Sequence, residues 1–254
     1  MNVSCIMNTY GRFETVRQSM TFWKQQDYED KELIIFNTAP IPLELDDSVK
    51  DNHEIRVVNW QTEAGTDIVY SSLGKIREDS IMFSRGDVYI CWDDDDMFLP
   101  WHISQGIKKL KEHGKPAWKP KRSYFSVDGG ETFKYAENSM EASILVDIEY
   151  IKEYGFNYES GTEHLKWLIP MRDNGDLVIE DINPFESYAY VWGSDLAPHK
   201  TSGNVDHPDN FENHKAGSTD FGEGKKLTFV PDEQVERLFI NCCETTYKNW
   251  KNIP

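Results

Sequence analysis

The feature that most constrains this chain is a run of four aspartates at residues 93–96, directly after the apolar residues 88–92. The sequence VYICW predicts a buried β-strand, which therefore ends in four adjacent carboxylates. Like charges a few ångströms apart oppose one another's ionisation, so a positive partner is expected among them. Mg²⁺ and Mn²⁺ are commonly held by carboxylates together with substrate phosphates. The run predicts a divalent-metal or phosphate site, and a solvated acidic turn is the alternative interpretation.

Apolar segments alternate with helical patterns over the first hundred residues. The expected strands are residues 3–7, 32–36, 55–58 and 88–92, and helical spacing covers 13–23 and 67–84. This alternation predicts an α/β domain with a mostly parallel sheet. Ligands bind at the carboxyl ends of strands in such sheets. Polar turns follow the strands there, so we expect these turns to converge on one crevice.

Composition excludes several classes of protein. With 254 residues and 39% hydrophobic content the chain can bury a large core. The net charge of −17 argues against a large surface for bare nucleic acid. We expect no signal peptide, because the start MNVSCIMNTYGRF has only a short apolar run, no basic n-region and no small-residue cleavage site. We expect no membrane span, because no apolar run approaches about 18 residues. Four cysteines fit neither a disulfide framework nor a zinc site, so we expect a cytoplasmic protein. They are Cys5, Cys91, Cys242 and Cys243.

Three segments resemble, in order and spacing, the start of family 2 glycosyltransferases of the GT-A fold. They are VSCIMNTYGRFETVRQSM, KELIIFNTAP and GDVYICWDDDDMFLP. The resemblance implies a Rossmann-like sheet flanked by helices and a nucleoside-diphosphate sugar, expected to be a UDP-sugar, as donor. It implies a catalytic domain over residues 1–203, with a nucleotide-sugar half (1–115) and an acceptor half (116–203). Residues 204–254 would form a C-terminal loop and helix.

The resemblance also implies roles for single residues. Thr9 and Tyr10 would line the nucleotide base, and Arg77 would lie near the base or the diphosphate. The aspartate run corresponds to the Asp-x-Asp element of the family. Its earlier carboxylates, Asp93 and Asp94, would contact the ribose and the sugar. Asp95 would bind the metal, expected to be Mn²⁺ or Mg²⁺.

The turn after the second strand departs from the family. Where the family has Asp-Asp-Gly-Ser, this chain has Asn37-Thr38-Ala39-Pro40. The amide of Asn37 has a donor and an acceptor that can pair with a pyrimidine edge. Ordinary turn chemistry is an equally supported interpretation of this residue.

The segment GFNYESGTEHLKWL, residues 155–168, resembles the part of the family that carries the catalytic base. Glu163 stands where the family keeps its catalytic Asp, which makes it the expected base of an inverting transfer. A carboxylate in the first turn of a helix is also stabilised by the helix dipole, which is the structural alternative. His164 is the rival candidate, as base, ligand or acceptor-side residue, because imidazole titrates near neutral pH.

The late segment SYAYVWGSDLAPHKTSG, residues 187–203, resembles a family loop that closes over the donor. Trp192 would belong to this lid, and His199 would complete the metal shell. A loop histidine is otherwise usually solvated. Further on, residues 231–243 predict an amphipathic helix that packs on the domain.

The sequence is compatible with several acceptors and with two activities other than glycosyl transfer. Basic and aromatic residues interleave in residues 117–125, which could meet a polymeric acceptor, although an edge strand is the preferred interpretation. The acceptor would be a sugar, a lipid carrier, a protein or a modified nucleic-acid base. Alternatives to the transferase are a nucleotidyltransferase, which often carries a glycine-rich loop absent here, and a non-catalytic nucleotide-sugar-binding module.

Overall fold

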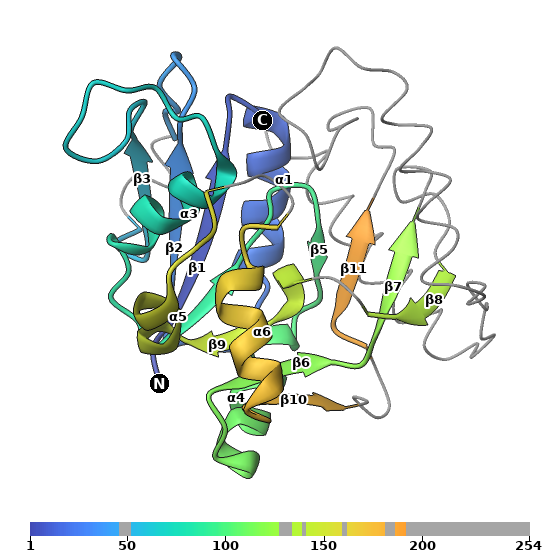
Figure 1. The fold of residues 1–254 in the computed structure, drawn as a ribbon. Helices are drawn as coiled ribbons and strands as arrows, with labels where there is room; N and C mark the ends of the chain where they lie inside the picture. Colours follow the sequence, from blue (N-terminus) through green and yellow to red (C-terminus); the bar gives the residue numbers. More distant parts are fainter. Residues whose placement is uncertain (46–51, 127–133, 139–140, 159–161, 181–185, 192–254) are drawn as a thin grey trace.

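The structure is a computed structural model that describes residues 1–191, apart from 46–51, 127–133, 139–140, 159–161 and 181–185 (Figure 1). Trp192, His199, the proposed lid, the boundary after residue 203 and the helix expected over 231–243 lie outside the described residues.

Four parallel strands form the first half of the central sheet, as predicted. They are β1 (Val3–Thr9), β2 (Lys31–Asn37), β3 (Ile55–Asn59) and β4 (Val88–Cys91). Their spatial order is β4-β1-β2-β3. The register pairs Thr9 with Asn37 and Asn37 with Asn59, so three strands end at the same edge of the sheet. Nearly every residue of β1, β2 and β4 is buried, which explains their continuous apolar character.

The second half of the central sheet mixes directions. Its strands are β9 (Leu145–Asp147), β6 (Ala117–Pro120) and β10 (Leu177–Glu180). β9 runs antiparallel to both β4 and β6, and β10 runs parallel to β6 at the edge. The seven strands follow the order β10-β6-β9-β4-β1-β2-β3.

A smaller sheet stands beside the central one (Figure 1). Its order is β5 (Met97–Phe98), β11 (Tyr188–Val191), β7 (Arg122–Ser126) and β8 (Lys134–Glu137). The basic and aromatic segment 117–125 was expected to be an edge strand, and this expectation is wrong. The segment divides at Lys121 between β6, which lies between β9 and β10, and β7, which lies between β11 and β8.

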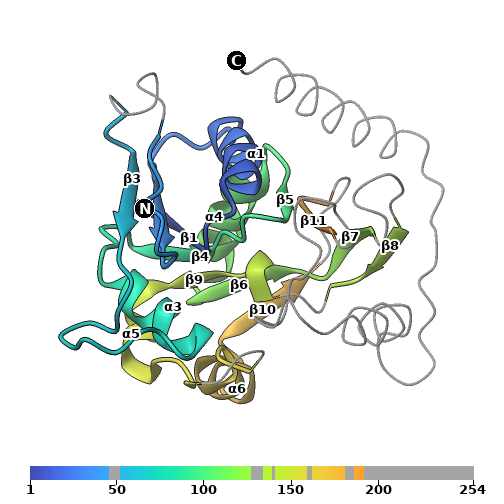
Figure 2. The same cartoon turned by 90° about the horizontal axis from the view of Figure 1, so that it is seen from above.

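Helices cover both faces of the central sheet. They are α1 (Phe13–Lys24), α3 (Leu73–Ile81), α4 (His102–His113), α5 (Ile148–Tyr154) and α6 (Leu165–Asp173), with a 3₁₀ turn η1 (Glu141–Ser143). Figure 2 shows α1 and α4 on one face and α3, α5 and α6 on the other. In the part of the chain that the structure describes, no helix has the length and apolar character needed to cross a membrane.

The helix expected over residues 67–84 is shorter than predicted. Val69 pairs with Thr62 in an isolated β-bridge, so the chain is still extended at this point. The helix starts after Ser72, whose hydroxyl accepts a hydrogen bond from the Lys75 backbone N–H at 3.2 Å. This is ordinary N-capping, and it fixes the first turn of α3 beside the carboxyl end of the sheet.

Candidate active site

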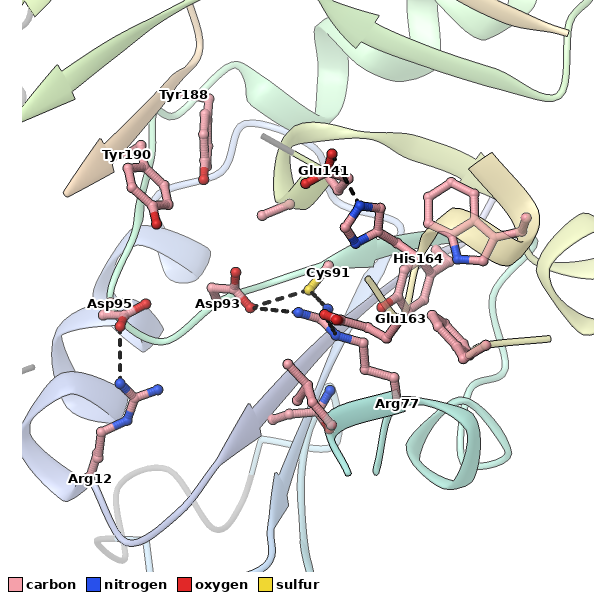
Figure 3. Close-up of a pocket in the computed structure, with 16 residues that line it drawn as sticks. Arg12, Arg77, Cys91, Asp93, Asp95, Glu141, Glu163, His164, Tyr188 and Tyr190 are labelled. Atoms are coloured by element: carbon pink, nitrogen blue, oxygen red, sulfur yellow. Dashed lines mark hydrogen bonds and ion pairs between the residues drawn. The ribbon is translucent and has the colours of Figure 1, made fainter. Parts of the chain in front are cut away.

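A cavity of about 220 Å³ opens at the carboxyl ends of β1 and β4. Its charged and imidazole side chains are Arg12, Arg77, Asp93, Asp95, Glu141, Glu163 and His164. Figure 3 shows Asp93 and Asp95 on one side, Glu141 and His164 on the other, and Arg77 reaching in between Asp93 and Glu163. The structure therefore brings together four of the residues singled out in the sequence, Arg77, Asp93, Asp95 and Glu163, together with the rival base His164.

The four aspartates divide into two pairs. Asp93 and Asp95 line the cavity, whereas Asp94 and Asp96 are each 1% exposed and point into the protein. Asp96 accepts hydrogen bonds from the Tyr188 hydroxyl and, at 3.2 Å, from the backbone N–H of Val191. Asp96 thus ties the aspartate run to β11, and only alternate carboxylates face the cavity.

Asp94 anchors the turn after β1. Its carboxylate accepts hydrogen bonds from Thr9 Oγ1 at 2.8 Å and Thr15 Oγ1 at 3.3 Å, and forms an ion pair with Arg12. Burial raises the pKa of Asp94, while the charge of Arg12 opposes that rise. The burial of Asp94 argues against the expected contact with a sugar, because its oxygens are occupied by protein donors.

Two arginines supply the positive charge expected among the aspartates. Arg12 Nη1 lies 3.0 Å from Asp95 Oδ2, and Arg77 Nη2 lies 3.7 Å from Asp93 Oδ1. The Cys91 thiol donates to the Asp93 carboxylate at 3.2 Å, and Arg77 also contacts the Cys91 sulfur. Burial raises the pKa of the Cys91 thiol, which keeps it protonated. Arg12 was not singled out in the sequence, although it lies in the TYGRF turn that carries part of the resemblance.

The turn residues expected to line the nucleotide base have contrasting surroundings. Tyr10 is 66% exposed, and Thr9 is buried against Asp94. Asn37 is fully buried, and its Oδ1 accepts from the backbone N–H groups of Gly11 and Ala39, both at 3.2 Å. Its Nδ2 donates to the Ile41 carbonyl at 2.9 Å and to Asn59 Oδ1 at 2.8 Å. The protein itself uses both amide atoms of Asn37, which favours the turn interpretation.

Asn8, near the end of β1, also lines the cavity, although nothing in the sequence singled it out beyond its polar character. Both amide atoms of its side chain are buried and have no hydrogen-bond partner among the described residues. Buried amides are normally bonded, so these atoms are suited to a polar ligand. The signal in the sequence is its place at the end of an apolar strand.

The start of α6 carries the two candidate bases in different settings. Glu163 is 4% exposed, and its carboxylate lies 3.2 Å from Arg77 Nε. His164 Nε2 lies 3.2 Å from Glu141 Oε1 in η1. Burial alone would raise the pKa of Glu141, but the hydrogen bond and charge of His164, with the charge of Lys119, lower it. Glu141 had no signal in the sequence.

The carboxylates at the cavity fit a divalent metal whose remaining ligands come from the substrate. Within the described ranges, no group of three or more His, Cys, Asp or Glu side chains is arranged to hold a metal ion. Mg²⁺ and Mn²⁺ prefer oxygen ligands and often need only one or two carboxylates besides water and substrate phosphates. Asp95 and Asp93 supply such oxygens at the cavity wall.

Comparison with known proteins supports the fold. No protein-family model and no curated protein sequence matches this chain. Among solved structures it is similar to TarS 1-349 of S. aureus in complex with UDP, with a TM-score of 0.58 and 13% identity. It is also similar to glucosyl-3-phosphoglycerate synthase of Mycobacterium tuberculosis, with a TM-score of 0.52 and 15% identity. A third is the mannosyltransferase PcManGT of Pyrobaculum calidifontis in complex with GDP-Man and Mn²⁺, with a TM-score of 0.52 and 11% identity.

These matches cover 71–75% of this chain. In turn, the chain spans 60% of the TarS structure, 69% of the synthase and 56% of the mannosyltransferase. At identities of 11–15% the likeness concerns the fold. The chain therefore has the α/β fold of GT-A-type glycosyltransferases, as expected from the sequence.

Proposed function

We propose that this protein is a glycosyltransferase that uses a divalent metal to move a sugar from a nucleoside-diphosphate sugar to an acceptor hydroxyl, with inversion. The observation that carries the proposal is the pair Asp93 and Asp95, which face one cavity at the end of β4 in a GT-A-type fold. The similar structures contain UDP, UDP-GlcNAc or GDP-Man, which supports this class of donor.

The donor would lie along the carboxyl edge of the sheet. Thr9 and the exposed ring of Tyr10 would flank the nucleotide base, and Asp93 would bind the ribose or the sugar. Arg77 would face the diphosphate, since its guanidinium lines the cavity beside Asp93. We assign Asp94 a supporting role, because it holds Thr9 and Arg12 in place.

Asp95 would hold Mn²⁺ or Mg²⁺, with His199 of the C-terminal segment as a further ligand. When bound, the metal supplies a Lewis acid that offsets the charge growing on the leaving diphosphate. The protein must also accept the proton of the acceptor hydroxyl and exclude water. The first task falls to the start of α6, where the sequence resemblance favours Glu163. The second falls to a lid that includes Trp192.

A ligand screen tests the proposal. UDP-, GDP- and dTDP-sugars are added to the protein with Mn²⁺ or with EDTA, and the melting temperature is measured. A ligand that binds only the folded state raises this temperature. At a concentration of 100 times its Kd, it stabilises the folded state by about 2.7 kcal/mol. We expect at least one donor to stabilise the protein in Mn²⁺ and to lose most of the effect in EDTA. No stabilisation by any donor in either condition would contradict the proposal.

Turnover separates the proposal from the binding-module alternative. The stabilising donor is incubated with Mn²⁺, and release of the nucleoside diphosphate is followed over hours. A transferase slowly passes the sugar to water when no acceptor is present, whereas a binding module leaves the donor intact. A nucleotidyltransferase would instead act on a nucleoside triphosphate and release pyrophosphate.

A further inference from the structure

We infer that His164, oriented by Glu141, is the general base that takes the proton from the acceptor hydroxyl, and that Glu163 instead positions Arg77. This assignment rests on the proposed function and replaces Glu163 as the expected base. It adds Glu141, which lies before β9 and more than twenty residues away in the chain, to the residues that position the reacting groups.

The geometry gives His164 a free basic nitrogen. Nε2 lies 3.2 Å from Glu141 Oε1, so with Glu141 ionised the ring proton sits on Nε2 and is donated to the carboxylate. The lone pair is then on Nδ1, the ring nitrogen that does not pair with Glu141. His164 and Glu141 both line the cavity, across from Asp93 and Asp95 (Figure 3). An acceptor hydroxyl in the cavity can therefore meet Nδ1.

Glu163 forms an ion pair with Arg77. Its side chain is 5% exposed and lies 3.2 Å from Arg77 Nε, while its backbone carbonyl accepts from the Asn157 N–H at 2.9 Å. Moving a proton onto Glu163 would break its ion pair with a guanidinium that is itself only 13% exposed. Removing one partner of a buried pair is costly, because the other charge is left without compensation. Glu163 therefore suits holding Arg77 better than cycling a proton.

The charged groups around His164 support its role. Glu141 faces Nε2 and stabilises the imidazolium that forms on proton transfer, as the carboxylate does in a catalytic triad. The charge of Lys119, which is 7% exposed, contributes to the lowered pKa of Glu141. Burial lowers the pKa of Lys119 to about 8, with the charge of Glu141 opposing this shift and the charge of Arg172 adding to it. Glu163, the neighbour in sequence, is paired with Arg77.

In the transfer step, the nucleoside diphosphate is the leaving group and His164 takes up the proton. The acceptor oxygen forms a bond to the anomeric carbon, and its proton moves to Nδ1 of His164. The bond from the anomeric carbon to the phosphate oxygen breaks, and its electron pair leaves with the nucleoside diphosphate. Nothing is oxidised or reduced. The imidazolium returns its proton to solvent after the products leave.

Donor hydrolysis provides the test, with water in the place of the acceptor. UDP-glucose, UDP-GlcNAc and GDP-mannose are incubated with the full chain and Mn²⁺, and kcat is measured for whichever donor the wild type cleaves. His164→Gln should lower kcat by on the order of a hundredfold or more, with donor affinity changed less than about twofold. It should also remove the fall in rate at acidic pH that protonation of an imidazole base produces.

Variants of the two glutamates separate positioning from structure. Glu141→Gln should lower kcat by on the order of tenfold and alter the acidic limb of the pH profile, and Glu141→Asp should restore part of the rate. Glu163→Gln should mainly weaken donor binding, because it releases Arg77. His113→Gln, on the far end of α4, serves as the control and should leave all parameters unchanged.

The possible outcomes distinguish the two proposals. If the wild type binds no donor, the proposed function fails, and this inference fails with it. If the wild type cleaves a donor but His164→Gln keeps the wild-type rate and pH profile, only the base assignment is overturned. Donor binding without any hydrolysis by the wild type would indicate a binding module and would overturn both proposals, since a competent base beside the anomeric carbon activates water.

Discussion

Arg12 and Asp95, 83 residues apart in the sequence, form an ion pair of 3.0 Å at the wall of the cavity. The same guanidinium also pairs with the buried carboxylate of Asp94. Arg12 thus links the turn after β1 to the aspartate run after β4. A divalent cation at Asp95 must share that carboxylate with Arg12, so metal binding and the position of the β1 turn are coupled.

Replacing Arg12 should destabilise the fold. Arg12→Gln leaves Asp94 buried without its cation, and we expect a loss of about 1–2 kcal/mol in the free energy of unfolding, measured with urea. The double variant with Asp94→Asn should recover part of this loss, because the two effects share one interaction. Lys24→Gln, at the exposed C-terminal end of α1, is the control. Additive losses in the double variant would show that the pair is not coupled.

Replacing Asp95 should remove metal-dependent donor binding. Asp95→Ala takes away the carboxylate that faces the cavity, while Asp94 and Asp96 keep the turn anchored. We expect the melting temperature without ligand to change little and the Mn²⁺-dependent stabilisation by the donor to disappear. Asp67→Asn, exposed in the segment before α3, is the matched control. Undiminished stabilisation in Asp95→Ala would place the metal elsewhere.

Gly74 allows α3 to approach the loop that carries the candidate bases. A Cβ at this position would lie 1.6 Å from the Asn157 carbonyl oxygen and 3.2 Å from Glu163 Cβ. We expect Gly74→Ala to cost about 2–3 kcal/mol of stability and to weaken donor binding by displacing Glu163 and Arg77. Gly114→Ala, where φ is +60° but the surrounding space is open, should cost only about 1 kcal/mol. Equal losses would mean that the contact at Gly74 has little importance.

His102 should give the fold a dependence on pH. It is fully buried, Nδ1 lies 2.9 Å from Ser187 Oγ, and burial lowers its pKa to about 3. Below pH 6.5 the unfolded chain binds a proton at this residue that the folded chain does not, so stability falls with pH towards about pH 3. Between pH 6.5 and pH 5 we expect a loss of about 1.5 kcal/mol from this group.

The variant His102→Gln isolates that contribution. Its stability at pH 7.5 should be lower than that of the wild type, because the core packing against Phe98 and Tyr188 is altered. On acidification from pH 7.5 to pH 5, its further loss should be smaller than that of the wild type by about 2 kcal/mol. His113→Gln, half-exposed at the end of the same helix, should retain the wild-type slope.

Local patterns predicted the first half of the sheet well. The continuous apolar runs of β1, β2 and β4 follow from burial on both faces, and the helical spacing of residues 13–23 reflects the buried face of α1. The position of the aspartate run at a strand end followed from the same patterns. These features depend on neighbours in the sequence, which is why the sequence alone suffices.

Long-range partners were not predictable in the same way. The cation beside Asp95 is Arg12 and the partner of His164 is Glu141, and both pairings depend on the order of strands. The strand at residues 117–120 lies inside the sheet because β10 pairs with it from a later part of the chain. Asn37 illustrates a different reason, since its hydrogen bonds to Gly11 and Asn59 arise from three strands ending together.

The most direct measurement is a crystal structure of the protein soaked with Mn²⁺ and UDP or GDP, using the anomalous scattering of manganese. We predict a peak at about 2.0–2.2 Å from a carboxylate oxygen of Asp95, with diphosphate oxygens in the same coordination shell and His164 facing the space beyond them. A nucleotide and metal bound away from Asp93 and Asp95, or a cavity that takes up neither, would contradict the account.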